Sequence, residues 1–176
     1  AILAVSLATA RAQAASAEMP LYVYLRKAYG LPESTWDLPA PMFNVINGGK
    51  HADSGLDVQE FMCVPTSAAS FHEALRAGAE IYQSLKKALA GRGMTIAVGD
   101  EGGFAPQIKT HEQVLEILTS VIASAGYGAQ VRLAIDCAAS EYYKDGKYAL
   151  EGKILSSAEI TSVYAGWASK YAVISI

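Results

Sequence analysis

The chain has 176 residues, of which 52% are apolar and 18% are charged, and its formal net charge is −3. This length and apolar content suit one ordinary domain with a real core, and they exclude an intrinsically disordered chain. The mild acidity and the lack of any basic run longer than Lys86-Lys87 exclude a broad nucleic-acid-binding surface, and two cysteines (Cys63 and Cys137) are too few for a disulfide scaffold, which favours a reducing cytosol.

Both ends of the chain are apolar: residues 1–3 read Ala-Ile-Leu with no Met, and residues 173–176 read Val-Ile-Ser-Ile. Because termini are usually polar and loose, we expect this sequence to be part of a longer protein. Residues 1–17 contain Ala-x-Ala patterns typical of signal peptides, but no charged segment precedes them and Arg11 interrupts them. They are also too short for a membrane span, so we predict a buried, Ala-rich helix over 2–15.

The first half of the chain predicts two helices and then two strands. The helices are expected over residues 2–15 and 21–29, and several prolines separate them from the strands. The apolar runs 42–47 and 58–64 predict short buried strands. A polar segment joins these runs directly, so we expect neighbouring strands with polar groups exposed at one end.

The second half of the chain alternates helical and strand patterns. Helices are expected over 71–89, 111–125 and 156–171, and strands over 96–98, 131–136 and 172–176, with a hairpin around Asp145-Gly146 within 141–150. The glycine-rich segment after residue 98 predicts a loop. The early strand-strand and helix-helix order, with alternation after it, predicts an α/β fold with a parallel sheet in its later part.

Polar side chains lie where the predicted strands end. His51, Glu101 and Asp136 each come at or after the end of an apolar run. In a parallel barrel the active site lies at the carboxyl ends of the strands, so these residues are candidates for a site. Gln59 and Glu60 are exceptions, because they are predicted inside an apolar strand, where a carboxylate is costly unless it is paired or bound.

Each of these residues also has a purely structural interpretation. His51 could be an ordinary loop histidine, Glu60 could face solvent from an edge strand, and Asp136 could cap a turn. Glu101 could belong to a plain turn, although the two glycines after it would let a backbone or ligand approach closely. His111 lies in the first turn of a predicted helix and is interpreted as a surface residue.

Taken together, the segments resemble enolases (phosphopyruvate hydratases) of bacterial type. The matching pieces are FNVINGGKHADSGLDVQEFM at 43–62, VGDEGGFAP at 98–106 and LAIDCAASEYYKDGKYAL at 133–150, with the opening AILAVSLATARAQA and the closing YAVISI. The resemblance implies a partial TIM-like barrel of enolase type, with ββαα then βα order. It implies that residues 1–38 are the helical end of the enolase N-terminal domain and that 39–176 begin the barrel domain.

The resemblance implies a reaction and a set of site residues. Enolases reversibly dehydrate 2-phosphoglycerate to phosphoenolpyruvate in glycolysis. Glu101 matches the proton donor to the leaving hydroxyl, Glu60 matches its carboxylate partner and a substrate-binding position, and His51 and Gln59 match substrate contacts. Asp136 matches the first of three carboxylates that hold the essential Mg²⁺. A raised pKa suits the acid, and we expect repulsion from Glu60 to raise the pKa of Glu101.

Several parts that the enolase reaction needs are expected outside this sequence. The base lysine and the other two Mg²⁺ ligands belong to later strands of the family's barrel. One carboxylate of three should hold Mg²⁺ weakly, so we expect the chain to be inactive alone. The resemblance also implies a cytoplasmic homo-oligomer, either a dimer or an octamer of dimers, with no membrane span and no nucleic-acid partner.

Two other functions compete with this interpretation. The chain could come from a different metal-assisted barrel enzyme of the same superfamily, although the GDEGGFAP loop argues against that. Alternatively it could act as a non-enzymatic binding protein, since some enolases lie on bacterial surfaces or are secreted and bind host proteins such as plasminogen. Nothing in the sequence specifically supports the binding function.

Overall fold

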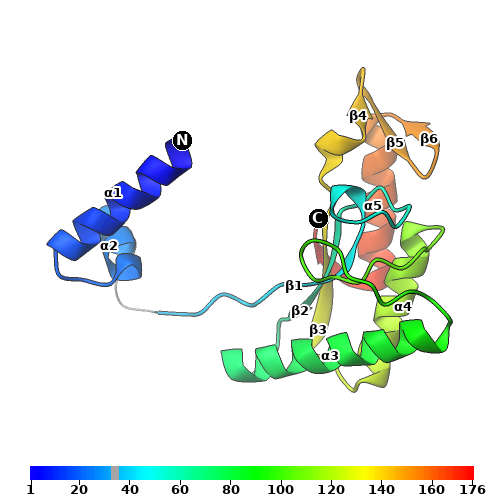
Figure 1. Ribbon diagram of the computed structural model, residues 1–176, viewed down its shortest axis with the longest axis horizontal. Coiled ribbons are helices and arrows are strands. Elements are labelled where there is room, and N and C mark those ends of the chain that lie inside the picture. Colours follow the sequence, from blue (N-terminus) through cyan, green and yellow to red (C-terminus); the bar gives the residue numbers. More distant parts are fainter. Residues whose placement is uncertain (33–35) are drawn as a thin grey trace. The chain divides into compact units, whose positions relative to one another are not determined.

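The computed structural model describes residues 1–32 and 36–176, which form two compact units, Ala1–Pro39 and Ala40–Ile176 (Figure 1). The first unit contains helices α1 (Ile2–Ser16) and α2 (Leu21–Ala28), which pack against each other. Both helices lie where the sequence predicts them. Their assignment to the enolase N-terminal domain stays a prediction.

The predicted burial of α1 is wrong. Ala14 is the single buried residue of this helix, while Ile2, Leu3 and Val5 are largely exposed. The apolar side chains of α1 are spread around the helix and form no stripe that α2 could cover, and each alanine offers little area to bury. Helix composition therefore predicts the element but not its burial.

A four-stranded sheet is the centre of the second unit (Figure 1). Its strands are β1 (Phe43–Asn47), β2 (Glu60–Pro65), β3 (Val131–Asp136) and β7 (Val173–Ser175), in that spatial order. β2 runs antiparallel to both β1 and β3, whereas β3 and β7 are parallel. The predicted α/β class and the adjacency of the first two strands are confirmed. Within the described residues the sheet is open.

Three helices cover the core of this unit: α3 (Phe71–Gly91), α4 (His111–Ser124) and α5 (Ser157–Tyr171). Each begins with a side-chain cap, because Ser70, Thr110 and Ser156 each accept a hydrogen bond from a backbone N–H of the first turn. α3 packs against β2 and α4, and α4 packs against α5. Their apolar faces enclose a core built around Phe61, Ile81, Leu85, Leu115 and Leu118, which are all fully buried.

A small three-stranded sheet lies outside the main one (Figure 1). It contains β4 (Tyr143–Lys144), β5 (Lys147–Leu150) and β6 (Lys153–Leu155). The predicted Asp145-Gly146 turn joins β4 and β5, and both residues have the positive φ that a tight hairpin turn requires. A second turn of this kind, at Glu151-Gly152, adds β6, a strand that was not predicted from the sequence.

The predicted strand over 96–98 is wrong. Val98 forms one isolated bridge to Phe104, and the segment is otherwise a loop. A run of three apolar residues forms a strand only where a neighbouring strand pairs with it, and Ile96 and Val98 are instead exposed. Two short 3-10 turns, Gly49–His51 and Ala139–Glu141, lie in other loops.

No helix in the described part of the chain is both long enough and apolar enough to cross a membrane.

Candidate functional site

Three strands bring their polar ends to one edge of the main sheet. Glu60 is paired with Asn47 of β1 on one side and with Asp136 of β3 on the other. Because β2 is antiparallel to both neighbours, its first residue lies at the edge where β1 and β3 end. Glu60 is the first residue of β2, so its predicted position in a strand is confirmed, whereas Gln59 lies just before β2 and its predicted position in the strand is wrong.

Backbone contacts hold the loop that carries Glu101 against the same edge. The Asn47 N–H of β1 donates a 2.9 Å hydrogen bond to the Phe104 carbonyl. The Asp100 N–H donates to the carbonyl of His51 at 3.1 Å. Gly99 lies so close to this carbonyl that a Cβ would be 2.5 Å from the oxygen. The loops of His51 and Glu101 thus lie directly against each other, and glycine allows the close approach.

His51, Glu60 and Glu101 form a cluster at this edge. One side-chain ligand atom from each lies within 4.8 Å of the others. The Nδ1 atom of His51 is 3.6 Å from Glu60 Oε1 and 3.5 Å from Glu101 Oε2, and it is buried without a hydrogen-bond partner. Buried polar atoms are usually hydrogen-bonded, so this cluster has unused capacity to bind a polar ligand.

The two carboxyl groups of this cluster have different proton affinities. Burial first, and then the hydrogen bond and charge of Glu101, raise the pKa of Glu60 to about 7. A hydrogen bond from Glu60 and another from Asn44 lower the pKa of Glu101. Repulsion was expected to raise the pKa of Glu101. The rise falls on Glu60 instead, because its side chain is 15% exposed and that of Glu101 is 50% exposed.

Asp136 lies beside the cluster with its carboxylate exposed at the end of β3. Its Oδ1 accepts a 2.9 Å hydrogen bond from the Ala138 N–H, and its Oδ2 has a 3.5 Å contact with the Gln59 side-chain amide. One oxygen is thus oriented by the backbone, and the other has only a weak partner. Carboxylate oxygens are the ligands that Mg²⁺ prefers, so Asp136 fits the role of a single Mg²⁺ ligand.

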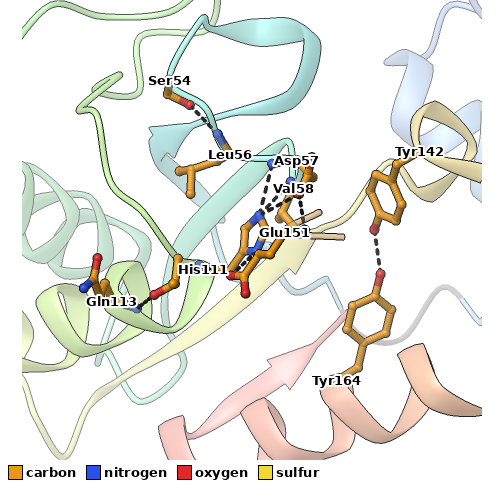
Figure 2. A network of polar contacts seen from close by, with 10 residues as sticks. Ser54, Leu56, Asp57, Val58, His111, Gln113, Tyr142, Glu151 and Tyr164 are labelled. Atoms are coloured by element: carbon orange, nitrogen blue, oxygen red, sulfur yellow. Dashed lines mark hydrogen bonds and ion pairs between the residues drawn. The ribbon is translucent and has the colours of Figure 1, made fainter. Parts of the chain in front are cut away.

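His111 is not on the surface, contrary to the sequence-based interpretation. Its side chain is 1% exposed, and Figure 2 shows it enclosed by Asp57, Val58 and Glu151. The Nε2 atom accepts hydrogen bonds from the backbone N–H groups of Asp57 and Val58 at 3.1 and 3.2 Å. Nδ1 lies 2.8 Å from Glu151 Oε1 and therefore carries the proton.

Two further hydrogen bonds close this network. Glu151 Oε1 also accepts from the His111 N–H at 2.7 Å, and Asp57 Oδ2 accepts from the Glu151 N–H at 2.7 Å. Burial lowers the pKa of His111, which matches the neutral form that two accepted hydrogen bonds require. The network fixes the backbone immediately before Gln59 and Glu60, and so it stabilises the position of these two site residues.

Two residues near Glu101 were not recognised in the sequence. Asn44 of β1 donates from Nδ2 to Glu101 Oε2 at 3.3 Å, and the Tyr82 hydroxyl of α3 donates to the Gly102 carbonyl at 2.7 Å. An asparagine inside an apolar strand was a usable signal for Asn44, because a buried amide needs partners. Tyr82 gave no signal, since a tyrosine at helical spacing is equally typical of a core.

The fold and this polar sheet edge identify the class of protein. A family model described as the enolase C-terminal TIM barrel domain matches residues 35–176. The chain therefore belongs to the enolase family.

A curated relative matches over a larger part of the chain. The enolase of Elusimicrobium minutum (strain Pei191) is 56% identical over all 176 residues. These residues cover 41% of that protein, so the chain spans about two fifths of the length of this relative.

Proposed function

We propose that this chain is part of an enolase that reversibly dehydrates 2-phospho-D-glycerate to phosphoenolpyruvate with Mg²⁺. The observation that carries the proposal is the cluster of His51, Glu60 and Glu101 within 4.8 Å, beside the exposed carboxylate of Asp136. Membership of the enolase family supports it. The activity is proposed for the full-length protein, and with it a role in glycolysis.

Asp136 would hold the metal together with carboxylates from later strands of the family's barrel. When bound, Mg²⁺ stabilises the negative charge that develops on the substrate carboxylate as the weakly acidic α-proton is lost. Within this chain, the Ala138 N–H donates to Asp136 Oδ1 and so orients the carboxylate that would bind the metal. His51 and Gln59, on the loop before β2, are proposed to contact the substrate.

Glu60 and Glu101 supply the proton that the leaving hydroxyl needs. Hydroxide is a poor leaving group, so an acid must protonate it as the C–O bond breaks. With one pKa raised to about 7 and the other lowered, the pair holds a single proton near neutral pH. Glu101 is the more exposed of the two and is proposed as the donor to the hydroxyl, while Glu60 keeps the shared proton available.

The proposal is tested by the formation of phosphoenolpyruvate from 2-phosphoglycerate by the purified full-length protein. Wild type should be active with Mg²⁺ and inactive after chelation. The Glu101→Gln variant should lose dehydration by at least about 10²-fold while Mg²⁺ binding stays nearly intact. Turnover of this variant at the wild-type rate would remove Glu101 from the acid role. A full-length wild type without dehydration activity would overturn the function itself.

The 176-residue chain alone should form no phosphoenolpyruvate above background. The family's base lysine and two of its metal carboxylates have no counterpart in the sequence matched to the family. Measurable product from the purified chain would contradict this expectation.

The location and assembly of the full-length protein are proposed from the family alone. We propose that the full-length protein is cytoplasmic. We also propose that it is a homo-oligomer of dimeric or octameric type, and its sedimentation would test the oligomeric state. Binding of host proteins at a cell surface stays a prediction, and labelling of intact cells would test it.

A further inference from the structure

The carboxyl group of Glu101 has a neutral amide neighbour on strand β1. Glu101 lies on a loop and its side chain is half exposed, whereas Asn44 lies on β1 and is half-buried. The Asn44 Nδ2 group donates to Glu101 Oε2 at 3.3 Å. A fixed amide donor on a strand can orient a carboxyl group that its own loop leaves free to rotate.

A β-bulge in β1 places the side-chain amides of Asn44 and Asn47 next to the loop that carries Glu101. The pairing between β1 and β2 shifts between Asn44 and Ile46, so that one extra residue is inserted. Residues three apart normally face opposite sides of a strand, but the bulge brings Asn44 and Asn47 to the same side. Both amide oxygens face Gly103, since a Cβ there would lie 2.2 Å from Asn47 Oδ1 and 3.1 Å from Asn44 Oδ1.

The fully buried Asn47 lies near the same glycine, Gly103, as Asn44 does. Neither amide atom of Asn47 has a hydrogen-bond partner as oriented, and the same is true of Asn44 Oδ1. The oxygen and nitrogen of an amide exchange places when the group turns by half a rotation, which would present Asn47 Nδ2 where its oxygen now meets Gly103. A donor at that point would be available to Asn44 Oδ1, which lies near the same position of Gly103.

Tyr82 of α3 contacts the Glu101 loop independently of Asn44. The Tyr82 hydroxyl donates to the carbonyl of Gly102, and the Tyr82 ring stacks on Phe104 with centroids 4.4 Å apart. Tyr82 holds the loop backbone but is not hydrogen-bonded to Glu101. The two supports can therefore be separated by mutation.

We propose that Asn44 is a positioning residue for Glu101. The Asn44 amide occupies Oε2 of Glu101, so that the proton shared with Glu60 passes to the hydroxyl through Oε1. This rests on the proposed function. As the C–O bond breaks, its electron pair stays with the hydroxyl oxygen, which takes the proton from Oε1 and leaves as water. The electron pair left on the α-carbon when its proton is lost forms the new carbon–carbon double bond. Glu101 becomes a carboxylate, and the Asn44 N–H stabilises that charge as it forms.

The test separates dehydration from the earlier loss of the α-proton in the full-length protein with Mg²⁺. Exchange of the substrate α-proton with solvent deuterium needs the base but not the acid, so it reports an intact site. We expect Asn44→Ala and the isosteric Asn44→Asp to lower kcat for dehydration about 10²-fold, with KM and α-proton exchange within about threefold of wild type. Retained exchange also shows that the variants are folded.

Two further variants control for a purely structural role. Asn44→Gln keeps the amide donor, and a cavity of about 510 Å³ lined by Asn44, Tyr82 and Glu101 has space for the extra methylene, so dehydration should recover to within about tenfold of wild type. Tyr82→Phe removes only the loop support and should lower exchange and dehydration equally, if at all.

Three results would overturn the proposal. The first is dehydration at the wild-type rate in Asn44→Ala. The second is a parallel loss of exchange and dehydration in both Asn44→Ala and Asn44→Asp, and the third is a Tyr82→Phe variant that loses dehydration alone. If the wild-type protein neither exchanges the substrate α-proton nor dehydrates the substrate, the proposed function itself is refuted.

Discussion

The molecule contains two histidine-centred polar regions that differ in how completely they are hydrogen-bonded. Around His111 both ring nitrogens have partners, and the flanking carboxylates of Asp57 and Glu151 accept backbone N–H groups (Figure 2). Around His51 the ring Nδ1 has none, although two carboxyl groups lie within 3.6 Å. A buried polar network that is satisfied stabilises a fold, whereas one left unsatisfied is available to a ligand.

The largest difference should appear when each histidine is replaced by alanine in the full-length protein. His51→Ala removes a proposed substrate contact and should lower dehydration about 10²-fold, yet change the free energy of unfolding by less than about 0.5 kcal/mol. Steady-state kinetics and urea unfolding measure the two quantities. A large loss of stability would mean that His51 is a structural residue.

His111→Ala should act mainly on stability. It leaves the N–H groups of Asp57 and Val58 without an acceptor and creates a cavity, which should cost on the order of 2–4 kcal/mol in urea unfolding. The exposed His72 of α3 provides the matched control, and His72→Ala should be within about 0.5 kcal/mol of wild type. Equal effects of the two variants would show that the network contributes nothing.

Glu60→Gln should change how the stability of the protein depends on pH. The pKa of Glu60 is raised to about 7 in the folded state, so the stability linked to its protonation is present below about 4.5 and is lost as pH rises through 7. The free energy of unfolding of Glu60→Gln minus that of wild type should therefore increase from pH 4.5 to pH 8. The increase should be about 1–2 kcal/mol after allowance for solvent screening. Urea unfolding at both pH values measures this. A pH-independent difference would contradict the raised pKa.

The His111 network should respond to pH with the opposite sign. Burial lowers the pKa of His111, so its contribution is present above the unfolded value of about 6.5 and is lost as pH falls below it. The stability difference between wild type and His111→Ala should shrink from pH 7.5 to pH 5.5, as measured by urea unfolding. A difference that grows toward pH 5.5 would mean that His111 is charged in the folded protein.

The smallest effect is expected from an ion pair on the loop of His51. Lys50 pairs with Glu141, but the Lys50 side chain is 71% exposed, so solvent screens the interaction. Lys50→Ala should cost no more than about 0.5 kcal/mol in urea unfolding, less at high salt. A cost above about 1 kcal/mol would show that this pair anchors the loop.

Local patterns predicted most of the elements. The strand over 131–136 and the Asp145-Gly146 hairpin could be predicted because alternation, apolar runs and turn chemistry act over a few residues. The strand over 96–98 and the third strand of the small sheet could not, since each depends on whether a partner strand lies beside it. Composition alone likewise could not predict the exposure of α1.

The amino-acid sequence was enough to indicate the family and the candidate residues, because its motifs place polar side chains next to glycines and strand ends. Which of these residues meet depends on the folded chain. The antiparallel direction of β2 brings Glu60 to the edge shared with Asp136, and the fold brings Asn44 of β1 within hydrogen-bond distance of Glu101. Burial then raises the pKa of Glu60 instead of Glu101 and places His111 in the core, since exposure depends on contacts between segments far apart in the chain.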